Sequence, residues 1–379
     1  MGDLVPKRIR GRYFAARMGF GRTVQVVIVV ASGILFDRVT VPGAPETAAA
    51  QGTLLLVICG VFALGAVLGC MDILVYRHVR EIVPPAPDPA APAPVGLLAP
   101  LKDRAFRRFV GYGITISFAM GVPGWFFWVY TTESLGFSKL AANILYLVIS
   151  PILGMLGLRA WGRLLDRWGR RPVLILGTCM TVFSVMPYFF STPHTPWPQF
   201  ITDVANWLAG AIGPLLGRQN WVWITPDMPV GAYMVVSISV LIGGIGWTGV
   251  MIGMNNVLMG FADTGGRSRF VASAQVLSSI GSALGAPVGG LVVTLIYSLP
   301  VSVWHVGPFI WTPYHATFAI SCLARLISVL WLINMPDPGA GSVRGMMRQI
   351  SLTAYNQLGH LVFFPLRLIS HTRRSKRKP

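Results

Sequence analysis

The sequence predicts an all-α polytopic membrane protein with about eight transmembrane helices. Apolar residues make up 54% of the 379 positions and charged residues only 12%, about half the charged share of a soluble domain. The mean hydropathy is +0.62, and the apolar residues gather in long runs separated by short basic segments. A soluble protein of this size needs more polar surface than these residues supply.

Eight apolar runs have the length of membrane-spanning helices. The sixth run is too long for one upright helix and too short for two crossings. We therefore expect it to tilt or to begin outside the hydrocarbon layer. The runs are Met18–Phe36, Thr53–Tyr76, Phe109–Tyr130, Leu140–Leu158, Val173–Phe190, Val230–Phe261, Phe270–Ser298 and Phe309–Met335.

The basic residues predict the orientation of these spans. Nearly all of the 31 lysines and arginines lie in alternate connecting segments and near the two ends of the chain. The opposite connections hold only Arg38, Lys139 and Arg218. Because cytoplasmic loops carry the excess of Lys and Arg, both termini are expected in the cytoplasm, in a plasma or inner membrane. The net charge of +18 then indicates anionic lipid headgroups, not nucleic acid, as the partner.

The segment Asp203–Asp227 is apolar in part but is not predicted to cross. A ninth span here would place Arg267, Arg269 and the whole basic tail outside the cell, against the charge distribution. Its tryptophans also suit the headgroup boundary. We expect an external loop with an interfacial or re-entrant piece.

Two segments outside the bilayer divide the chain. Pro84–Pro100 is rich in proline and alanine, which predicts a semi-rigid cytoplasmic linker. The tail Ser342–Pro379 mixes apolar with basic residues and is expected to lie along anionic lipid headgroups of the cytoplasmic leaflet. The expected parts are two spans with a basic N-terminal loop in 1–80, the linker in 81–105, a six-helix bundle in 106–335 and the basic tail in 336–379.

A dense charged segment, Gly162–Pro172, connects the fourth and fifth spans. Its glycines permit a tight turn, and the carboxylate of Asp166 can cap or pair with the positive end of a neighbouring helix. The arginines hold the loop at the membrane surface. A basic anchoring turn with no switching role explains the same composition. The candidate residues are Gly162, Asp166, Arg167, Gly169, Arg170 and Arg171.

A short pattern occurs twice, each time just before a span that contains glycine and serine. Arg10–Ala15 and Arg267–Ala272 both read R-x-R-aromatic-x-A, with arginines at Arg10, Arg12, Arg267 and Arg269. One loop repeated at equivalent places is typical of a transporter with internal duplication. Six residues are few, and chance also explains the match.

The spacing G-x-x-x-D-R-x-G-R-R in the charged segment resembles the cytoplasmic loop signature of the major facilitator superfamily of secondary transporters. Residues 106–335 resemble the whole carboxy-terminal six-helix half of such a protein. Phe126–Tyr130 and Leu135–Ser138 resemble the end of its first helix and the following outer loop. The charged segment then falls between its second and third helices, where the family carries the signature.

The same register has consequences for the start of the chain. Gly2–Tyr76 resembles only the last two helices of the amino-terminal half, so the first four of twelve helices are expected to be missing. Met1 then resembles an internal methionine of a longer reading frame. The resemblance also implies that Asp166 meets the start of the first span here, near Gly11–Arg17.

Polar residues inside the spans are candidates for a solute path. Arg325 lies in the last span, where an arginine costs about 2.5–3.5 kcal/mol on insertion scales. It either faces a central cavity and binds an anionic group or pairs with an acid, or it snorkels to the cytoplasmic headgroups or lies against a neighbouring helix. Asn255, Asn256 and Gln275 either line a polar path or form hydrogen bonds between helices.

The resemblance implies transport of a small solute by alternating access. The sequence carries no nucleophile elbow, phosphate-binding loop or zinc motif, so we expect neither an enzyme nor a cofactor or metal. The alternative function is that of a non-transporting membrane remnant that binds lipid or partner subunits through its basic segments.

Overall fold

The structure is a computed structural model, and its fold is that of an all-α polytopic membrane protein. It describes residues 20–21, 23–32, 35, 48–75, 77, 96, 98–216, 222–226, 228–262, 267–307, 309–337, 340–349 and 351–352. Within these residues, seven helices are long and apolar enough to cross a membrane. The first predicted span lies partly outside the described residues, and its portion Thr23–Ser32 is a shorter apolar helix.

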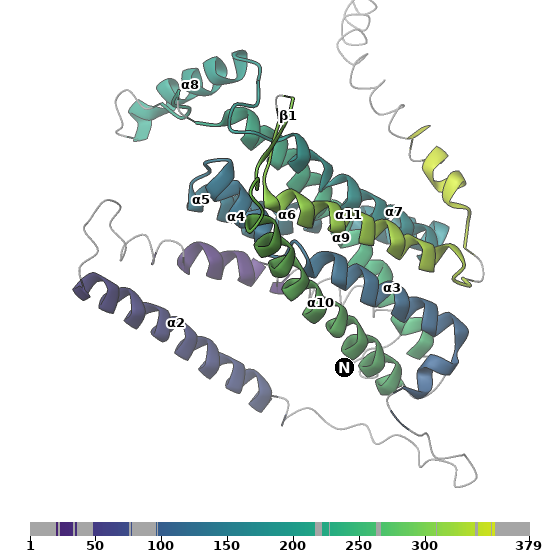
Figure 1. Cartoon of the computed structure of the whole chain (residues 1–379). Coiled ribbons are helices and arrows are strands. Elements are labelled where there is room, and N and C mark those ends of the chain that lie inside the picture. Colours follow the sequence, from purple (N-terminus) through teal and green to yellow (C-terminus); the bar gives the residue numbers. More distant parts are fainter. Residues whose placement is uncertain are drawn as a thin grey trace, which may run out of the picture.

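The second predicted span is helix α2, Ala48–Val75. It is apolar on all sides, and its spanning part, Leu55–Val75, buries no residue against the described protein. The remaining spanning helices belong to a bundle that begins after the short 3-10 helix Ala99–Lys102 (Figure 1). This bundle is where the candidate site lies.

Three spanning runs of the bundle depart from a regular α-helix partway, at turns in the first and third and at a continuous π-helical segment in the second. We refer to these three places as breaks. Gly124 follows Pro123 in the first break and has φ +34°, a value that L side chains rarely adopt. Pro151 begins the regular helix after the second break, and Pro187 begins the 3-10 turn after the third. Proline removes a backbone donor and is a usual cause of such breaks. The segments are α3 (Arg104–Gly121), α4 (Phe126–Val129) and the π-helix Tyr130–Ser134; α5 (Lys139–Asn143), the π-helix Ile144–Ile149 and α6 (Ser150–Trp168); and α7 (Arg170–Phe183) with the 3-10 helix Met186–Phe190.

The other three spanning helices of the bundle run without a break. They are α9 (Val230–Ala262), α10 (Arg267–Tyr297) and α11 (Pro313–Ile333). The 33 residues of α9 extend for about 50 Å at 1.5 Å per residue. The sixth apolar run is thus one helix that is longer than a hydrocarbon layer of about 30 Å. This length agrees with the expectation that the run tilts or begins outside the layer.

Glycines allow two pairs of helices to pack with backbones in contact. Along α3 and α10, a Cβ atom on Gly285 would lie 2.6 Å from the Phe118 carbonyl oxygen and 3.0 Å from the Cα of Gly121. Along α7 and α9, a Cβ atom on Gly177 would lie 3.0 Å from the backbone nitrogen of Val250. The first contact leaves no room for a Cβ atom and the second is tight, so α3–α10 and α7–α9 are two closely packed pairs.

Aromatic side chains fill the bundle between these pairs. Near the start of α3, Phe106 meets the ring edges of Phe261 and Phe270 at centroid distances of 5.3 and 4.9 Å. Farther along, Phe127 stacks on Phe318 of α11 at 4.6 Å. Such ring pairs add to the stability that the burial itself provides.

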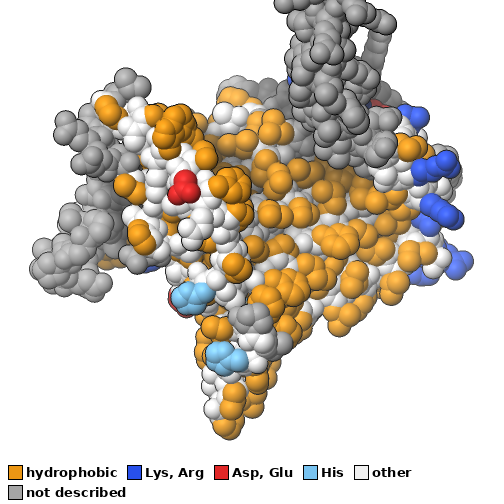
Figure 2. All heavy atoms as spheres, turned by 90° about the horizontal axis from the view of Figure 1, so that it is seen from above, with side chains coloured by type: hydrophobic (Ala, Val, Ile, Leu, Met, Phe, Trp, Pro, Cys, Tyr) orange, Lys and Arg blue, Asp and Glu red, His pale blue; other side chains and the backbone are white. Residues whose placement is uncertain are grey.

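The two ends of the bundle differ in charge and in structure. Lys and Arg side chains gather at one end, and the broad surface between the ends is mainly hydrophobic (Figure 2). The other end carries α8 (Phe200–Ile212) and an antiparallel hairpin of β1 (Trp304–Val306) and β2 (Phe309–Trp311), which pairs Trp304 with Trp311. This hairpin lies where the prediction placed only the start of the last span.

Helix α8 belongs to the segment that was predicted not to cross. Its 13 residues are continued only by the short 3-10 helix Gly213–Leu216, and it is among the helices too short to span. The Asn206 side chain accepts hydrogen bonds from the backbone N–H groups of Trp223 and Ile224 and donates one to the Ile224 carbonyl. These bonds fold the segment back on itself.

Candidate functional site: a cavity at three interrupted helices

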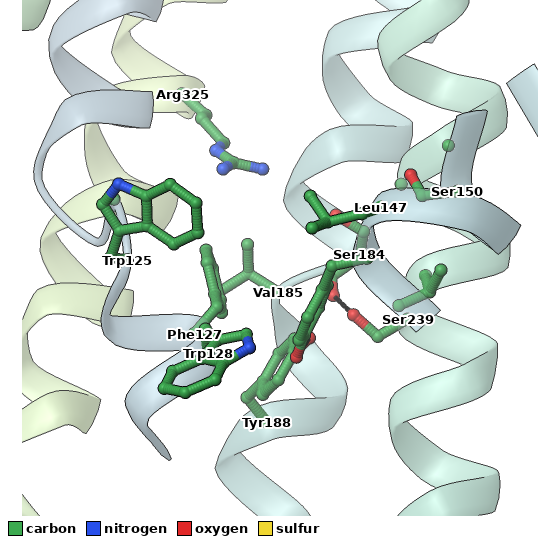
Figure 3. Close-up of a pocket in the computed structure, with 15 residues that line it drawn as sticks. Trp125, Phe127, Trp128, Leu147, Ser150, Ser184, Val185, Tyr188, Ser239 and Arg325 are labelled. Atoms are coloured by element: carbon green, nitrogen blue, oxygen red, sulfur yellow. Dashed lines mark hydrogen bonds between the residues drawn. The ribbon is translucent and has the colours of Figure 1, made fainter. Parts of the chain in front are cut away.

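A cavity of about 240 Å³ lies inside the bundle at the level of the three helix breaks (Figure 3). The first break supplies Gly124 and Trp125, and the third supplies Ser184 and Val185. The π-helix of the second run supplies Tyr146, and α9 and α11 complete the lining. The turns keep backbone groups paired here: the Gly124 N–H donates to the Met120 carbonyl, and the Ser184 N–H donates to the Met180 carbonyl.

Arg325 of α11 lines this cavity and is only 4% exposed. Its guanidinium group extends toward the open space in Figure 3. One Nη atom donates a hydrogen bond to the backbone carbonyl of Thr181, and the other lies 3.6 Å from the sulfur of Met120. Its Nε has no hydrogen-bond partner. Among the described residues no carboxylate pairs with Arg325, so its charge is buried without a counter-ion.

Aromatic rings form a large part of the cavity wall. Phe127 lies between Phe318, on which it stacks, and Tyr188, at a centroid distance of 4.8 Å. The Tyr188 and Tyr146 hydroxyl oxygens are 2.7 Å apart and share a hydrogen bond. These contacts hold the rings in fixed positions, so their orientation does not depend on a ligand.

Two further aromatic residues of the wall are tryptophans. The indole N–H of Trp128 donates to the Asn143 side-chain oxygen at 2.9 Å. Trp125, in the first break, is 74% exposed. It is also one of the residues that line the cavity, and it is far more exposed than the rings around Phe318.

Serine side chains line the opposite wall. The Ser184 hydroxyl donates to the Thr181 carbonyl at 2.8 Å, and the Ser239 hydroxyl donates to the Ser184 carbonyl. Ser150 lies at the start of α6 and is half-buried. The carbonyls at the end of α7 are thus partly satisfied by side chains, as is usual where a buried helix ends.

The charged segment Gly162–Pro172 forms the tight connection between α6 and α7. Gly169 has φ +86° at the turn, a conformation that favours glycine. The carboxylate of Asp337, after α11, accepts hydrogen bonds from the backbone N–H groups of Arg170 and Arg171. Asp337 therefore caps the positive end of α7. The sequence interpretation assigned such a role to Asp166 and did not identify Asp337.

Asp166 and the other residues predicted for this segment do not form the cap. Asp166, Arg167 and Arg170 are exposed, and a Cβ atom on Gly162 would meet no atom within 4 Å. Asp166 forms no hydrogen bond or ion pair with the residues that the structure describes. Its expected partner segment, Gly11–Arg17, lies outside those residues, so the contact stays a prediction.

The beginning of the tail packs on the same connection. The Gly341 N–H donates to the Trp168 carbonyl at 2.9 Å, and the Trp168 indole donates to the Gln349 side chain at 3.1 Å. Met346 is fully buried in a cluster with Trp161 and Val173. The described part of the tail thus rests on protein, whereas the expectation was a tail along the lipid headgroups. Most of the tail lies outside the described residues.

The remaining predicted residues lie away from the cavity. Asn255 and Gln275 are exposed, and Asn256 donates to the Ile252 carbonyl of its own helix. Their role in a solute path stays a prediction. Arg10 and Arg12 lie outside the described residues; Arg267 begins α10 and Arg269 is half-buried in its first turn.

Several lining residues were missed by the sequence interpretation. Phe127, Tyr146, Tyr188, Ser184 and Ser239 are ordinary residues for a membrane helix, and nothing in their types marks them. The signal that could have located them is the presence of proline or a Pro-Gly pair within three successive apolar runs. No described group of three His, Cys, Asp or Glu residues is arranged to hold a metal ion.

The comparison with known families agrees with this architecture. The family model described as Major Facilitator Superfamily matches residues 1–213, more than half of the chain. The match includes the charged segment and all three interrupted runs of the bundle. A comparison with curated proteins found no significant match. The predicted lack of four preceding helices stays a prediction. The family match and the membrane-spanning helices together show that the chain belongs to the major facilitator superfamily, a family of membrane transporters.

Proposed function

We propose that this protein moves a small solute across a membrane by alternating access, with the cavity at the three helix breaks as the solute site. The observation that carries the proposal is the convergence of the breaks on one cavity whose lining also contains a buried charge. Secondary transporters commonly bind their solutes near the bilayer midplane, between discontinuous helices. A protein that only binds lipid or partner subunits has no need of such a cavity.

The depth of the cavity supports this assignment. From the basic end of the bundle, α3, α6 and α7 run for 18, 19 and 14 residues before the breaks. At 1.5 Å per residue these helices are about 20–28 Å long. In a hydrocarbon layer of about 30 Å, a cavity at this distance from the basic end lies in the half of the layer that is nearer the hairpin.

We also propose that the basic end of the bundle faces the cytoplasm of a plasma or inner membrane. The support is the gathering of Lys and Arg at one end of the bundle, because cytoplasmic loops carry such an excess. The proposed contact between the basic segments and anionic lipids follows from the same charge.

Cysteine accessibility tests alternating access without knowledge of the solute. Cys59, Cys70, Cys179 and Cys322 are first replaced by serine or alanine, and Ser150→Cys is introduced as the reporter in the cavity. A membrane-impermeant methanethiosulfonate reagent is applied to intact cells and, separately, to inverted membrane vesicles. Alternating access predicts modification of Ser150→Cys from both sides.

The matched control is Thr178→Cys. Thr178 is fully buried in α7, and its hydroxyl is 2.8 Å from the hydroxyl of Tyr112. It should react from neither side, which shows that labelling reports the cavity and not unfolding. Modification of Ser150→Cys from one side only would contradict alternating access and favour a non-transporting membrane protein.

A further inference from the structure

We propose that the solute of this cavity is a small organic monoanion, with its charged group on Arg325 and a flat apolar body against Trp125, Phe127 and Trp128. The inference rests on the proposed function, because it names the class of solute that the same site takes. Three features of the described residues carry it: the buried charge, the aromatic wall and the size of the cavity.

The buried charge identifies the sign of the ligand. The guanidinium group of Arg325 has five N–H donors, yet its described partners are one carbonyl, that of Thr181, and the weakly accepting sulfur of Met120. Its Nε is unpartnered. A buried cation without a counter-ion is unfavourable, and a carboxylate or sulfonate matches the planar fork of a guanidinium with two parallel hydrogen bonds.

The lining limits the ligand to a single negative charge. Arg325 is the one side chain in the lining that carries a charge at neutral pH; the others are apolar, aromatic, serine or glycine residues. A phosphate dianion would leave one charge uncompensated in the membrane. A cation would be drawn to the rings but repelled by Arg325, which lies in the same cavity.

The aromatic wall and the volume of the cavity indicate the shape and size of the uncharged part of the ligand. Trp125 lines the cavity, and Phe127 is held in place by the stack on Phe318 at 4.6 Å. Trp128 is held by its hydrogen bond to Asn143 at 2.9 Å. Flat, preorganised rings favour a flat apolar partner. A volume of about 240 Å³ is below the roughly 300–1,000 Å³ of sites for drug-sized ligands, so a body of about one ring is expected.

Binding measurements on the purified full chain test the proposal. The protein is placed in nanodiscs of phosphatidylcholine, and binding is followed by isothermal titration calorimetry at pH 7.5. The probe is benzenesulfonate, which stays ionised at this pH. Benzenesulfonamide has the same ring and no charge, methanesulfonate has the charge and no ring, and benzylamine has the opposite charge.

We expect benzenesulfonate to bind at least about tenfold more tightly than benzenesulfonamide and benzylamine, since hydrogen bonds to charged groups are worth about one to two powers of ten. It should also bind more tightly than methanesulfonate, which has no ring to bury against the aromatic wall. Equal binding of benzenesulfonamide would overturn the assignment of an anion. Equal binding of methanesulfonate would overturn the aromatic body. Tightest binding of benzylamine would overturn both, and no binding of any probe would overturn the proposal as a whole.

Two sets of variants, each with a control, locate the probe. Arg325→Gln should weaken benzenesulfonate binding about tenfold or more, Arg325→Lys should retain part of it, and the exposed Arg163→Gln should leave it unchanged. Trp125→Ala should weaken binding, whereas Trp207→Ala, on the exposed face of α8, should not. Unfolding temperatures identify any variant that fails to fold. Unchanged binding in folded Arg325→Gln and Arg325→Lys would overturn the site.

The failures of the two proposals are distinguishable. If Ser150→Cys is labelled from both sides but benzenesulfonate does not bind, transport stands and the monoanion is wrong. If benzenesulfonate binds at Arg325 but Ser150→Cys is labelled from one side only, the anion site stands and alternating access is wrong.

Discussion

The carboxylate of Asp337 accepts a hydrogen bond from the backbone N–H of Arg171 at 2.9 Å, although the two residues are 166 positions apart. A second bond from the N–H of Arg170, at 3.0 Å, completes the cap. Because Asp337 follows α11 and Arg171 lies in the first turn of α7, the bonds tie the ends of two helices that also share Arg325. The basic end of the bundle is therefore held together by a backbone-to-carboxylate contact.

Asp337→Ala is expected to lower the free energy of unfolding by about 1 kcal/mol, the usual cost of removing a helix N-cap. Thermal unfolding of the purified protein measures the change. The control is Asp166→Ala, because Asp166 is exposed and such substitutions usually change stability by less than about 0.5 kcal/mol. A larger effect for Asp166→Ala than for Asp337→Ala would show that Asp166 is the capping residue.

Met346→Ala is expected to loosen the beginning of the tail. Met346 is fully buried beside Trp161, whereas the neighbouring Met347 is 44% exposed. Truncating a buried methionine costs about 2–5 kcal/mol, so Met346→Ala should speed tryptic cleavage after Arg344 and Arg348, while Met347→Ala should not. Gel electrophoresis of timed digests measures the rate. Equal rates in the two variants would contradict the packing of the tail.

Gly285→Leu is expected to separate α3 from α10. The Cβ alone would lie 2.6 Å from the Phe118 carbonyl oxygen, and overpacking costs about 1–3 kcal/mol or more. Gly290→Leu, in the same helix, is the control, because a Cβ there meets no atom within 4 Å. Yield of folded protein and unfolding temperature should fall only in Gly285→Leu. If the yield and the unfolding temperature fall equally in Gly290→Leu, the loss of stability comes from the leucine itself and not from the contact between the helices.

Single cysteines at the two ends of the bundle test its orientation. Arg163, at the basic end, and Val301, before the hairpin, are both exposed. In a variant without native cysteines, Val301→Cys should react with an impermeant maleimide in intact cells. Arg163→Cys should react only in inverted vesicles, since the basic end is expected in the cytoplasm. The reverse pattern would place the basic end outside.

The spans and the buried arginine could be predicted because both depend on local composition. Long apolar runs indicate spanning helices, and an arginine within such a run is easily recognised in the sequence. The face of α9 could not be predicted in the same way. This helix is apolar all round, so the sequence gives no sign that Ser239 faces the cavity while Asn255 is exposed.

The partners of the site depend on contacts between distant segments. The sequence separation between Arg325 and Thr181 is 144 residues, and Asp337 reaches Arg170 over a similar distance. No periodicity within one span carries such information. The helix breaks are an intermediate case: Pro123, Pro151 and Pro187 are visible in the sequence, but only the packed bundle brings them to one level.

The tight glycine contacts have a mechanical consequence. The α3–α10 pair and the α7–α9 pair cannot slide internally without collision of their backbones, so each pair moves as a unit. Arg325 touches Met120 of the first pair and Thr181 of the second. Any shear between the two pairs must therefore break or exchange a contact of this one side chain. Movement of one helix pair against the other is thus coupled to the residue that we propose as the anion site.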